Sequence, residues 1–280
     1  MRKRVLLAVL AHPDDESFGP GATLARYAAE GVDVHICTLT DGAAGTADPD
    51  CDDCLEGYKD LADRRRGELA CAVEILGGTL HLFNYRDSGM AGDEANKHPD
   101  AFIKQPLEEV TERLSDLMRQ LKPDVILTHD DTGGYFHPDH IYAHQATLAA
   151  YRATYPAETV APSLYCSVIP RTFIRYFAWL GRLTGQDPTR FGQNKDIDLT
   201  RIGKPSDQIH VRVNIRNYLP IKEKASACHT SQGGGGRLSG RKSFGLRRWI
   251  IAWLSKQFGK QELFQQLIPP PSGRRTGFFD

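Results

Sequence analysis

Two four-residue motifs in this chain begin with the same three residues: His-Pro-Asp-Asp at 12–15 and His-Pro-Asp-His at 137–140. Each follows an apolar run typical of a β-strand, at 5–10 before the first motif and at 125–128 before the second. Proline restricts the residue before it to extended geometry and is favoured at the first position of a helix. Both motifs are therefore expected where a strand passes into a helix, with Asp14 and Asp15 in a first helical turn, where the macrodipole favours carboxylates.

The spacing within the motifs brings metal-binding groups together. Residues three apart share one side of a helix, which pairs His12 with Asp15 and His137 with His140. If the two strands lie in one sheet, the pairs converge. Two imidazoles and one carboxylate around a divalent ion, with a position left for water, form a catalytic zinc arrangement. A single His-Pro-Asp motif is more typical of a capped helix start than of a metal site, but the occurrence of two favours a metal site.

Such a site has the parts needed to hydrolyse an unactivated amide. Zinc lowers the pKa of a bound water to about 7 and polarises a carbonyl group. A carboxylate beside the metal but not bound to it acts as a base, and this is Asp14 if Asp15 is the ligand. His137 and Tyr135 are suited to stabilising the oxyanion and protonating the leaving amine. Spacing alone does not decide which aspartate binds the metal.

Composition excludes several classes of protein. The 280 residues contain 35 basic and 35 acidic side chains, so there is no strongly basic domain of the kind that binds nucleic acid. No apolar stretch approaches the length of a transmembrane helix. The apolar run after the basic N-terminus leads directly into the first motif, and cleavage there as a signal peptide would remove the proposed site. We therefore expect a cytoplasmic protein.

Six cysteines do not form a dense disulfide framework in a chain of this length. Cys51 and Cys54 are the only close pair and lie in a polar stretch that reads as a loop. A disulfide that pins this loop, or two free thiols, accounts for them better than a redox motif or a metal site. Cys37 and Cys71 have apolar neighbours and are expected to fill the core.

Strand and helix patterns alternate along the first half of the chain. Strands are predicted at 5–10, 32–40, 80–83 and 125–128, and helices at 21–30, 60–76, 103–121 and 139–151. The alternation predicts an α/β fold with a Rossmann-like, mostly parallel sheet and helices on both faces. Ligands bind at the carboxyl ends of the strands in such sheets, where both motifs fall.

The pattern loosens in the second half of the chain. Strands are expected at 163–169 and 208–215 and a helix at 219–229. We therefore divide the chain into a metal-binding catalytic core at 1–160 and a smaller α+β elaboration at 161–280 that completes the substrate pocket, in the same compact domain or as a small subdomain.

The motifs at 11–16 and 133–140 resemble those of the PIG-L/LmbE family of zinc-dependent de-N-acetylases. The resemblance extends to Thr-Asp-Gly at 40–42 and Arg-Arg-Gly-Glu-Leu at 65–69. Arg-Asp-Ser-Gly-Met at 86–90 and His-Thr-Ser-Gln at 229–232 resemble the mycothiol-pathway branch, which contains an N-acetylglucosaminyl-inositol deacetylase and a conjugate amidase. The resemblance to the family covers most of the first 150 residues and only patches of the remainder.

The resemblance assigns roles to ten residues. It implies that zinc is held by His12, Asp15 and His140. It implies that Asp14 is the general base, that His137 is a catalytic histidine oriented by Asp139, and that Tyr135 helps to polarise the amide carbonyl. It implies that the sugar pocket is lined by Arg65, Asp87 and Met90. Iron or another divalent ion would suit the same donors. His229 is expected either to approach the site or to cap its helix, and His129 carries no motif and is not predicted as a ligand.

The expected function is hydrolysis of the N-acetyl group of a small molecule that contains N-acetylglucosamine. A first alternative keeps the metal site and moves the scissile amide to a thiol conjugate. A second is a membrane- or partner-docking protein that uses the aromatic and basic segment 246–258, which is typical of an interfacial helix. A helix packed on its own domain or on another subunit of a homo-oligomer is the commoner explanation of such a segment. A structural zinc would be closed by four protein ligands, so the surplus of acidic and basic groups favours catalysis.

Overall fold

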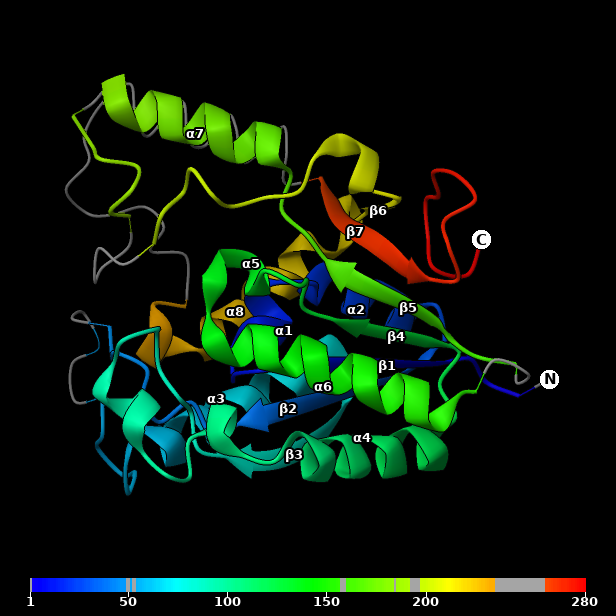
Figure 1. The fold of residues 1–280 in the computed structure, drawn as a ribbon, viewed down its shortest axis with the longest axis horizontal. Helices are drawn as coiled ribbons and strands as arrows, with labels where there is room; N and C mark the ends of the chain where they lie inside the picture. Colours follow the sequence, from blue (N-terminus) through cyan, green and yellow to red (C-terminus); the bar gives the residue numbers. More distant parts are fainter. Residues whose placement is uncertain are drawn as a thin grey trace.

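A mostly parallel sheet runs through the centre of the protein (Figure 1). The computed structural model describes residues 2–48, 51, 54–156, 160–183, 185–191, 197–234 and 260–280. Within these ranges the sheet has seven strands in the order β3–β2–β1–β4–β5–β7–β6. The strands are β1 (Val5–Leu10), β2 (Asp33–Thr40), β3 (Thr79–Tyr85), β4 (Val125–Thr128), β5 (Ser163–Ser167), β6 (Val211–Asn214) and β7 (Gln261–Ile268).

The first five strands pair in parallel, and β7 runs antiparallel to both β5 and β6. The sequence of β1 explains its central place, because all six of its residues are apolar and buried. Leu6 and Leu10 point into one hydrophobic core, and Leu7 and Val9 point into the other. A strand buried on both faces is what a parallel sheet between two helical layers requires.

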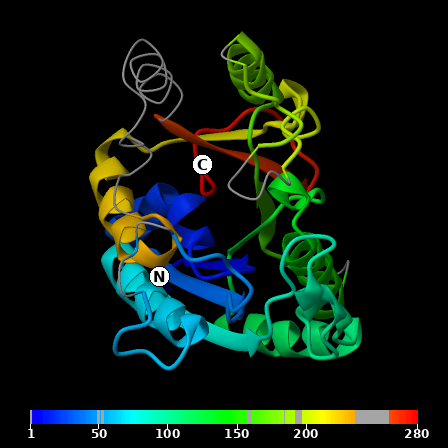
Figure 2. The same cartoon turned by 90° about the vertical axis from the view of Figure 1, so that its left-hand side faces the viewer.

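Helices cover both faces of the sheet (Figure 2). One face carries α2 (Gly21–Ala29), α3 (Leu61–Leu76) and α8 (Leu219–Cys228), and the other carries α4 (Leu107–Leu121) and α6 (Pro138–Thr154). The short helices α1 (Asp15–Phe18) and α5 (Gly133–Phe136) follow β1 and β4, and α7 (Arg171–Leu183) lies apart from the main layers. Single 3₁₀ turns lie at Glu94–Lys97, Phe102–Lys104, Ser206–Gln208, Arg216–Tyr218 and Thr230–Gln232.

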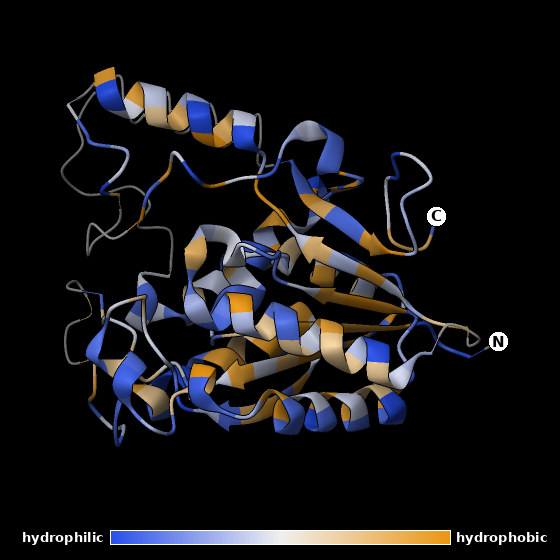
Figure 3. Ribbon diagram, viewed as in Figure 1, coloured by the Kyte–Doolittle hydropathy of each residue, from blue (hydrophilic) through white to orange (hydrophobic). Residues whose placement is uncertain are grey.

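The observed architecture confirms the predicted α/β class. Apolar residues are concentrated in the central strands, whereas the outer helices alternate between apolar and polar positions (Figure 3). The helix predicted at 103–121 begins only at Leu107, because Pro106 cannot lie in a helix interior and stands before its first residue. No helix in the described ranges has both the length and the apolarity to cross a membrane. The segment 246–258 lies outside the described residues.

Two disulfides correct part of the cysteine analysis. Cys51 and Cys54 are bonded, one of the two states expected for them. Cys71 was expected in the core, but it lies on the exposed face of α3 and is bonded to Cys228 of α8. The reason is that its partner is 157 residues away, which no local pattern reveals. Cys37 and Cys166 are buried free thiols.

The cysteine pairing predicts a specific thiol count. Without reductant, the native protein is expected to react slowly or not at all with a thiol reagent, because both free thiols are buried. Unfolding should release two thiols per chain, and reduction should raise the count to six. A spectroscopic thiol titration in the three states tests this, and six thiols in the unfolded, unreduced protein would contradict the assignment.

Candidate active site

The first motif holds Asp14 in an unusual backbone conformation. Asp14 has φ 120° and lies before α1, which begins at Asp15, so the expectation that Asp14 falls in the helical turn is wrong. A positive φ is costly for a residue with a side chain and persists only where neighbours enforce it. Glu16 Oε2 accepts a 3.0 Å hydrogen bond from the Asp14 N–H. Arg65 Nη2 donates to Pro13 O at 2.6 Å and to Asp14 Oδ2 at 3.1 Å.

The second motif follows the predicted geometry. Pro138 is the first residue of α6, and His137 caps it by accepting a hydrogen bond from the Asp139 N–H at Nδ1, 3.2 Å away. Because Nδ1 is an acceptor, the proton of the neutral ring is on Nε2. Burial, reinforced by the charge on His12, lowers the pKa of His137 to about 3, so the ring is neutral at pH 7 and donates from Nε2.

The three predicted ligands present their donor atoms to one point. His12 Nδ1 lies 3.0 Å from His140 Nε2. Asp15 Oδ2 lies 3.8 Å from His12 Nδ1, and Asp15 Oδ1 lies 3.4 Å from His140 Nε2. Ligand atoms about 2.1 Å from a tetrahedral ion are roughly 3.4 Å from one another. The three separations bracket that value.

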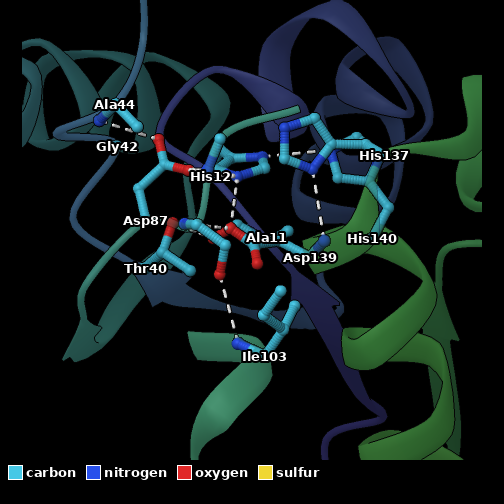
Figure 4. Close-up of polar contacts among 12 residues, drawn as sticks. Ala11, His12, Thr40, Gly42, Ala44, Asp87, Ile103, His137, Asp139 and His140 are labelled. Carbon is cyan, nitrogen blue, oxygen red and sulfur yellow. Dashed lines mark hydrogen bonds and ion pairs between the residues drawn. The ribbon is translucent and has the colours of Figure 1, made fainter. Parts of the chain in front are cut away.

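The hydrogen-bond partners of the two imidazoles leave one nitrogen of each ring turned toward the other. His140 Nδ1 faces the Gly133 carbonyl oxygen at 3.2 Å, and therefore carries a proton. His12 Nε2 faces Asp139 Oδ2 at 3.2 Å and Asp87 Oδ1 at 3.4 Å, and carries a proton for the same reason (Figure 4). His12 Nδ1 and His140 Nε2 then face each other at 3.0 Å, a distance at which the two nitrogens share either one proton or one metal ion. A divalent metal between them would take the place of that proton, and the carboxylates of Asp15, Asp87 and Asp139 near His12 suit a cation there, so the residues fit one.

Asp139 acts on a different histidine from the one expected. Its carboxylate accepts from His12 Nε2 and from the Ser88 N–H, at 3.2 and 2.9 Å, and only its backbone N–H reaches His137. Side chains two apart on a helix do not face each other, which explains why the Asp139 carboxylate does not reach the His137 ring. A carboxylate on the far nitrogen of a ligating histidine is a common outer-sphere arrangement.

The local charge favours a bound cation. Burial opposes protonation of His12, but Asp87, Asp139 and Asp15 outweigh it and hold the pKa of His12 well above its usual value. Burial, partly opposed by Arg65, raises the pKa of Asp14 to about 6. The carboxylates of four residues therefore make the electrostatic potential at this buried site negative: Asp14, Asp15, Asp87 and Asp139.

A polar cavity of about 240 Å³ opens over the cluster. Seven of the ten predicted residues line it: His12, Asp14, Arg65, Asp87, Met90, Tyr135 and His137. Asp15 and His140 line a second cavity, which Tyr135 also lines, and Asp139 contacts His12 Nε2. Burial, then the charge of Asp15, raises the pKa of Tyr135 well above its usual value, so its hydroxyl stays protonated. Ile197 and Gln232 also line the polar cavity.

His129 belongs to the cluster, although no sequence motif predicts it as a ligand. Its Nε2 lies 3.3 Å from Asp15 Oδ2 and accepts a 3.0 Å hydrogen bond from the Ala11 N–H. Its ring stacks on His140 with centroids 4.0 Å apart. Three groups of described residues have donor atoms close enough to hold a metal ion: His129 with Asp15 and His140, His12 with His137 and His140, and His12 with Asp87 and Asp139. The signal for it is position alone, since it directly follows β4, at the sheet edge where the His12 motif follows β1.

His229 approaches the site, one of the two roles left open for it. It is fully buried, and its Nε2 lies 2.7 Å from Oε1 of the equally buried Glu16. Glu16 is the residue whose other oxygen binds the Asp14 N–H. The segment is fixed by Glu68, which accepts hydrogen bonds from the Ser231 N–H and hydroxyl at 2.9 and 2.6 Å. His229 therefore supports the backbone of Asp14 through Glu16.

Sequence comparison agrees with this geometry. Residues 7–151 match the family model of the GlcNAc-PI de-N-acetylases, PIG-L. The chain is 37% identical over 268 residues to a protein of Acidothermus cellulolyticus named 1D-myo-inositol 2-acetamido-2-deoxy-alpha-D-glucopyranoside deacetylase, a match that spans 89% of this chain and 88% of the relative.

Solved structures share the fold at lower identity. The N,N'-diacetylchitobiose deacetylase of Pyrococcus horikoshii has a TM-score of 0.56 at 22% identity, over 94% of this chain and 84% of that one. The 4-carboxy-2-hydroxymuconate hydratase GalB of Pseudomonas putida has a TM-score of 0.55 at 18% identity, over 98% of this chain and 99% of that one. Because one fold carries both activities, fold alone does not decide function. The family model matches residues 7–151, and the Acidothermus relative is matched over 89% of this chain. This chain therefore belongs to the PIG-L family of de-N-acetylases.

Proposed function

We propose that this protein is a zinc-dependent hydrolase that removes the acetyl group from the 2-acetamido group of an N-acetylglucosaminyl-inositol. One observation carries the chemistry: one nitrogen of each of two imidazoles converges beside Asp15, while a second carboxylate, Asp14, is held by Arg65 in the wall of a polar cavity. The names of the matched relatives support the sugar and its inositol group.

His12, Asp15 and His140 are the residues that would hold the zinc. Bound there, zinc would supply a Lewis acid that polarises the amide carbonyl and lowers the pKa of a water molecule to about 7. His129 lies within reach of Asp15, and the His12 N–H donates to Asp15 Oδ2 at 2.8 Å and fixes its carboxylate. Asp139 and Gly133 O fix the ring orientations of His12 and His140.

Asp14 is the general base in this proposal. Arg65 and Glu16 hold it so that its carboxylate lines the polar cavity, where it accepts the proton of the attacking water. As the amide C–N bond breaks, the same proton passes to the departing amine. Tyr135 and His137 Nε2–H donate to the oxygen that becomes negative in the tetrahedral transition state.

Asp87 and Met90 are proposed to bind the sugar. Asp87 already accepts from the Gly89 and Ala44 N–H groups at 2.8 and 3.2 Å, and keeps acceptor capacity for a hydroxyl. Arg65 was predicted to bind sugar as well. Its guanidinium is engaged by Pro13 O, Gly42 O and Asp14, so we assign it chiefly to holding the base.

Release of free amine from a panel of amides tests the function. The panel contains N-acetylglucosamine alone, its inositol- and malate-linked forms, diacetylchitobiose and a thiol conjugate. Zinc-loaded protein is expected to cleave the inositol-linked form with the highest kcat/KM, chelation to abolish cleavage, and added zinc to restore it. A thiol conjugate as the best substrate would move the assignment to an amidase, and no cleavage by zinc-loaded protein would overturn it.

The packing of Arg65 on Gly42 gives a second prediction. Gly42 has φ +67°, and a Cβ there would lie 2.6 Å from Arg65 Cζ. We expect Gly42→Ala to move the guanidinium away from Asp14 and to lower kcat about 10–100-fold, with zinc still bound, as outer-sphere changes do. Gly31→Ala is the matched control, since Gly31 has φ +86° and a Cβ added to it would have no neighbouring atom within 4 Å. Equal losses in both variants would show that backbone strain, not Arg65, is responsible.

A further inference from the structure

The proposed metal ligands line two cavities of different character. The polar cavity of about 240 Å³ has His12, Asp14 and His137 in its wall. The second, of about 580 Å³, has Asp15 and His140 in its wall. Tyr135 lines both. Because the proposed metal ligands are divided between the two walls, a group bound by His12, Asp15 and His140 would border both cavities.

The second cavity is mainly apolar. Its wall includes Leu10, Phe18, Val168, Ile169 and Phe173, which come from β1, α1, the end of β5 and the start of α7. Phe18 and Ile169 are 45% and 41% exposed, so part of this apolar wall is open to solvent. An exposed apolar patch that continues into a catalytic site is typical of a ligand-binding surface.

An amide substrate has an amine part and an acyl part, one on each side of its carbonyl carbon. The polar cavity, with Asp87, Arg65 and Asp14, matches the hydroxyl-rich sugar that carries the amine. The acyl part then extends past Tyr135 into the apolar cavity. The methyl of an acetyl group, roughly 30 Å³ if compared with a water molecule, fills only a small part of 580 Å³.

We propose that the apolar cavity is an acyl-binding site and that the enzyme hydrolyses N-acyl amides of its sugar with aliphatic acyl groups longer than acetyl. The inference rests on the proposed function and extends its substrate class. The reaction is unchanged: water adds to the carbonyl carbon, the C–N bond breaks, the acyl group leaves as a carboxylate and the amine takes the proton. The longer chain gains binding energy from burial against Leu10, Val168 and Phe173.

The test compares N-acetyl, N-butyryl and N-hexanoyl glucosaminyl-inositol, with the released amine as a common readout. Burial of a methylene supports about a two- to fourfold gain each, so kcat/KM for the hexanoyl substrate is expected to exceed that for acetyl by at least about tenfold. Ile169→Asp puts a charge in the apolar wall and should lower the hexanoyl-to-acetyl ratio about tenfold. Trp179→Asp on α7 is the control, because Trp179 is 54% exposed and outside the lining, and should leave the ratio unchanged.

Two results would overturn the acyl-binding site: kcat/KM that falls as the chain lengthens, or a ratio that Ile169→Asp does not change. If the protein cleaves no member of the series, the proposed function fails. Calorimetry then decides on the cavity by itself, with acetate and hexanoate as probes of the zinc-loaded protein. Hexanoate should bind at least about tenfold more tightly than acetate, and less so in Ile169→Asp. Equal affinities would overturn the site independently of catalysis.

Discussion

Asp14→Asn is expected to lower kcat about 10³-fold or more while bound zinc stays at one ion per chain. Asparagine keeps the size of the side chain but cannot take a proton from water, and general base catalysis contributes about 10²–10⁴-fold. Loss of the charge that faces Arg65 also removes the ion pair that orients the side chain. Steady-state kinetics and metal analysis of the same preparations measure both quantities.

The same change at the neighbouring aspartate distinguishes a general base from a metal ligand. Asp15→Asn is expected to lose zinc as well as activity, because Asp15 faces both His12 and His140. Asp116→Asn, an exposed change on α4, controls for the removal of any carboxylate. If Asp14→Asn loses zinc and Asp15→Asn retains it, the roles of base and ligand are reversed. The sequence alone left that choice open.

His140→Ala is expected to abolish stable zinc binding and reduce activity by more than 10³-fold. The variant removes one of the three proposed protein ligands, and loss of an outer-sphere partner alone already costs about 10–100-fold in metal affinity or activity. Gly133 O would also lose its hydrogen-bond donor, since His140 Nδ1 is its partner. Competition with a chromogenic chelator gives the affinity, and circular dichroism checks that the fold is intact.

The control for this variant is another histidine. His81 lies on β3 beside His35, outside the metal cluster, and His81→Ala should leave zinc affinity unchanged. The zinc affinity of His129→Ala should lie between those of His140→Ala and His81→Ala, because His129 stacks on His140 and contacts Asp15. Full zinc affinity in His140→Ala would show that the metal is held by a different set of residues.

Local sequence rules predicted most of the fold and the place of the site, because the signals are short-range. The unbroken apolar run of β1 and Pro138 at the start of α6 each act within a few residues. The same proline rule failed at Pro13. There, Asp14 takes a positive φ, and the groups that impose it include Arg65, which is 51 residues further along the chain.

Other features depend on contacts that no motif encodes. His129 has the residue type of a ligand but no neighbouring pattern, so it was not predicted, and only its position directly after β4 offered a signal for it. Cys71 has apolar neighbours in sequence, yet α3 turns it outward to meet Cys228. The Asp139 carboxylate is bound to His12 across 127 residues, a pairing that exists only once β1 and α6 lie side by side.

The Glu16–His229 contact imposes an order on how the active site is built. A chain synthesised as far as Thr154 already contains all ten residues predicted for the site. The Glu16–His229 contact that supports the Asp14 backbone is still missing, because His229 is 213 residues beyond Glu16. The support of the Asp14 backbone therefore requires α8, which packs on α2 and α3. The complete candidate site therefore depends on the last third of the chain, which contains α8 and His229.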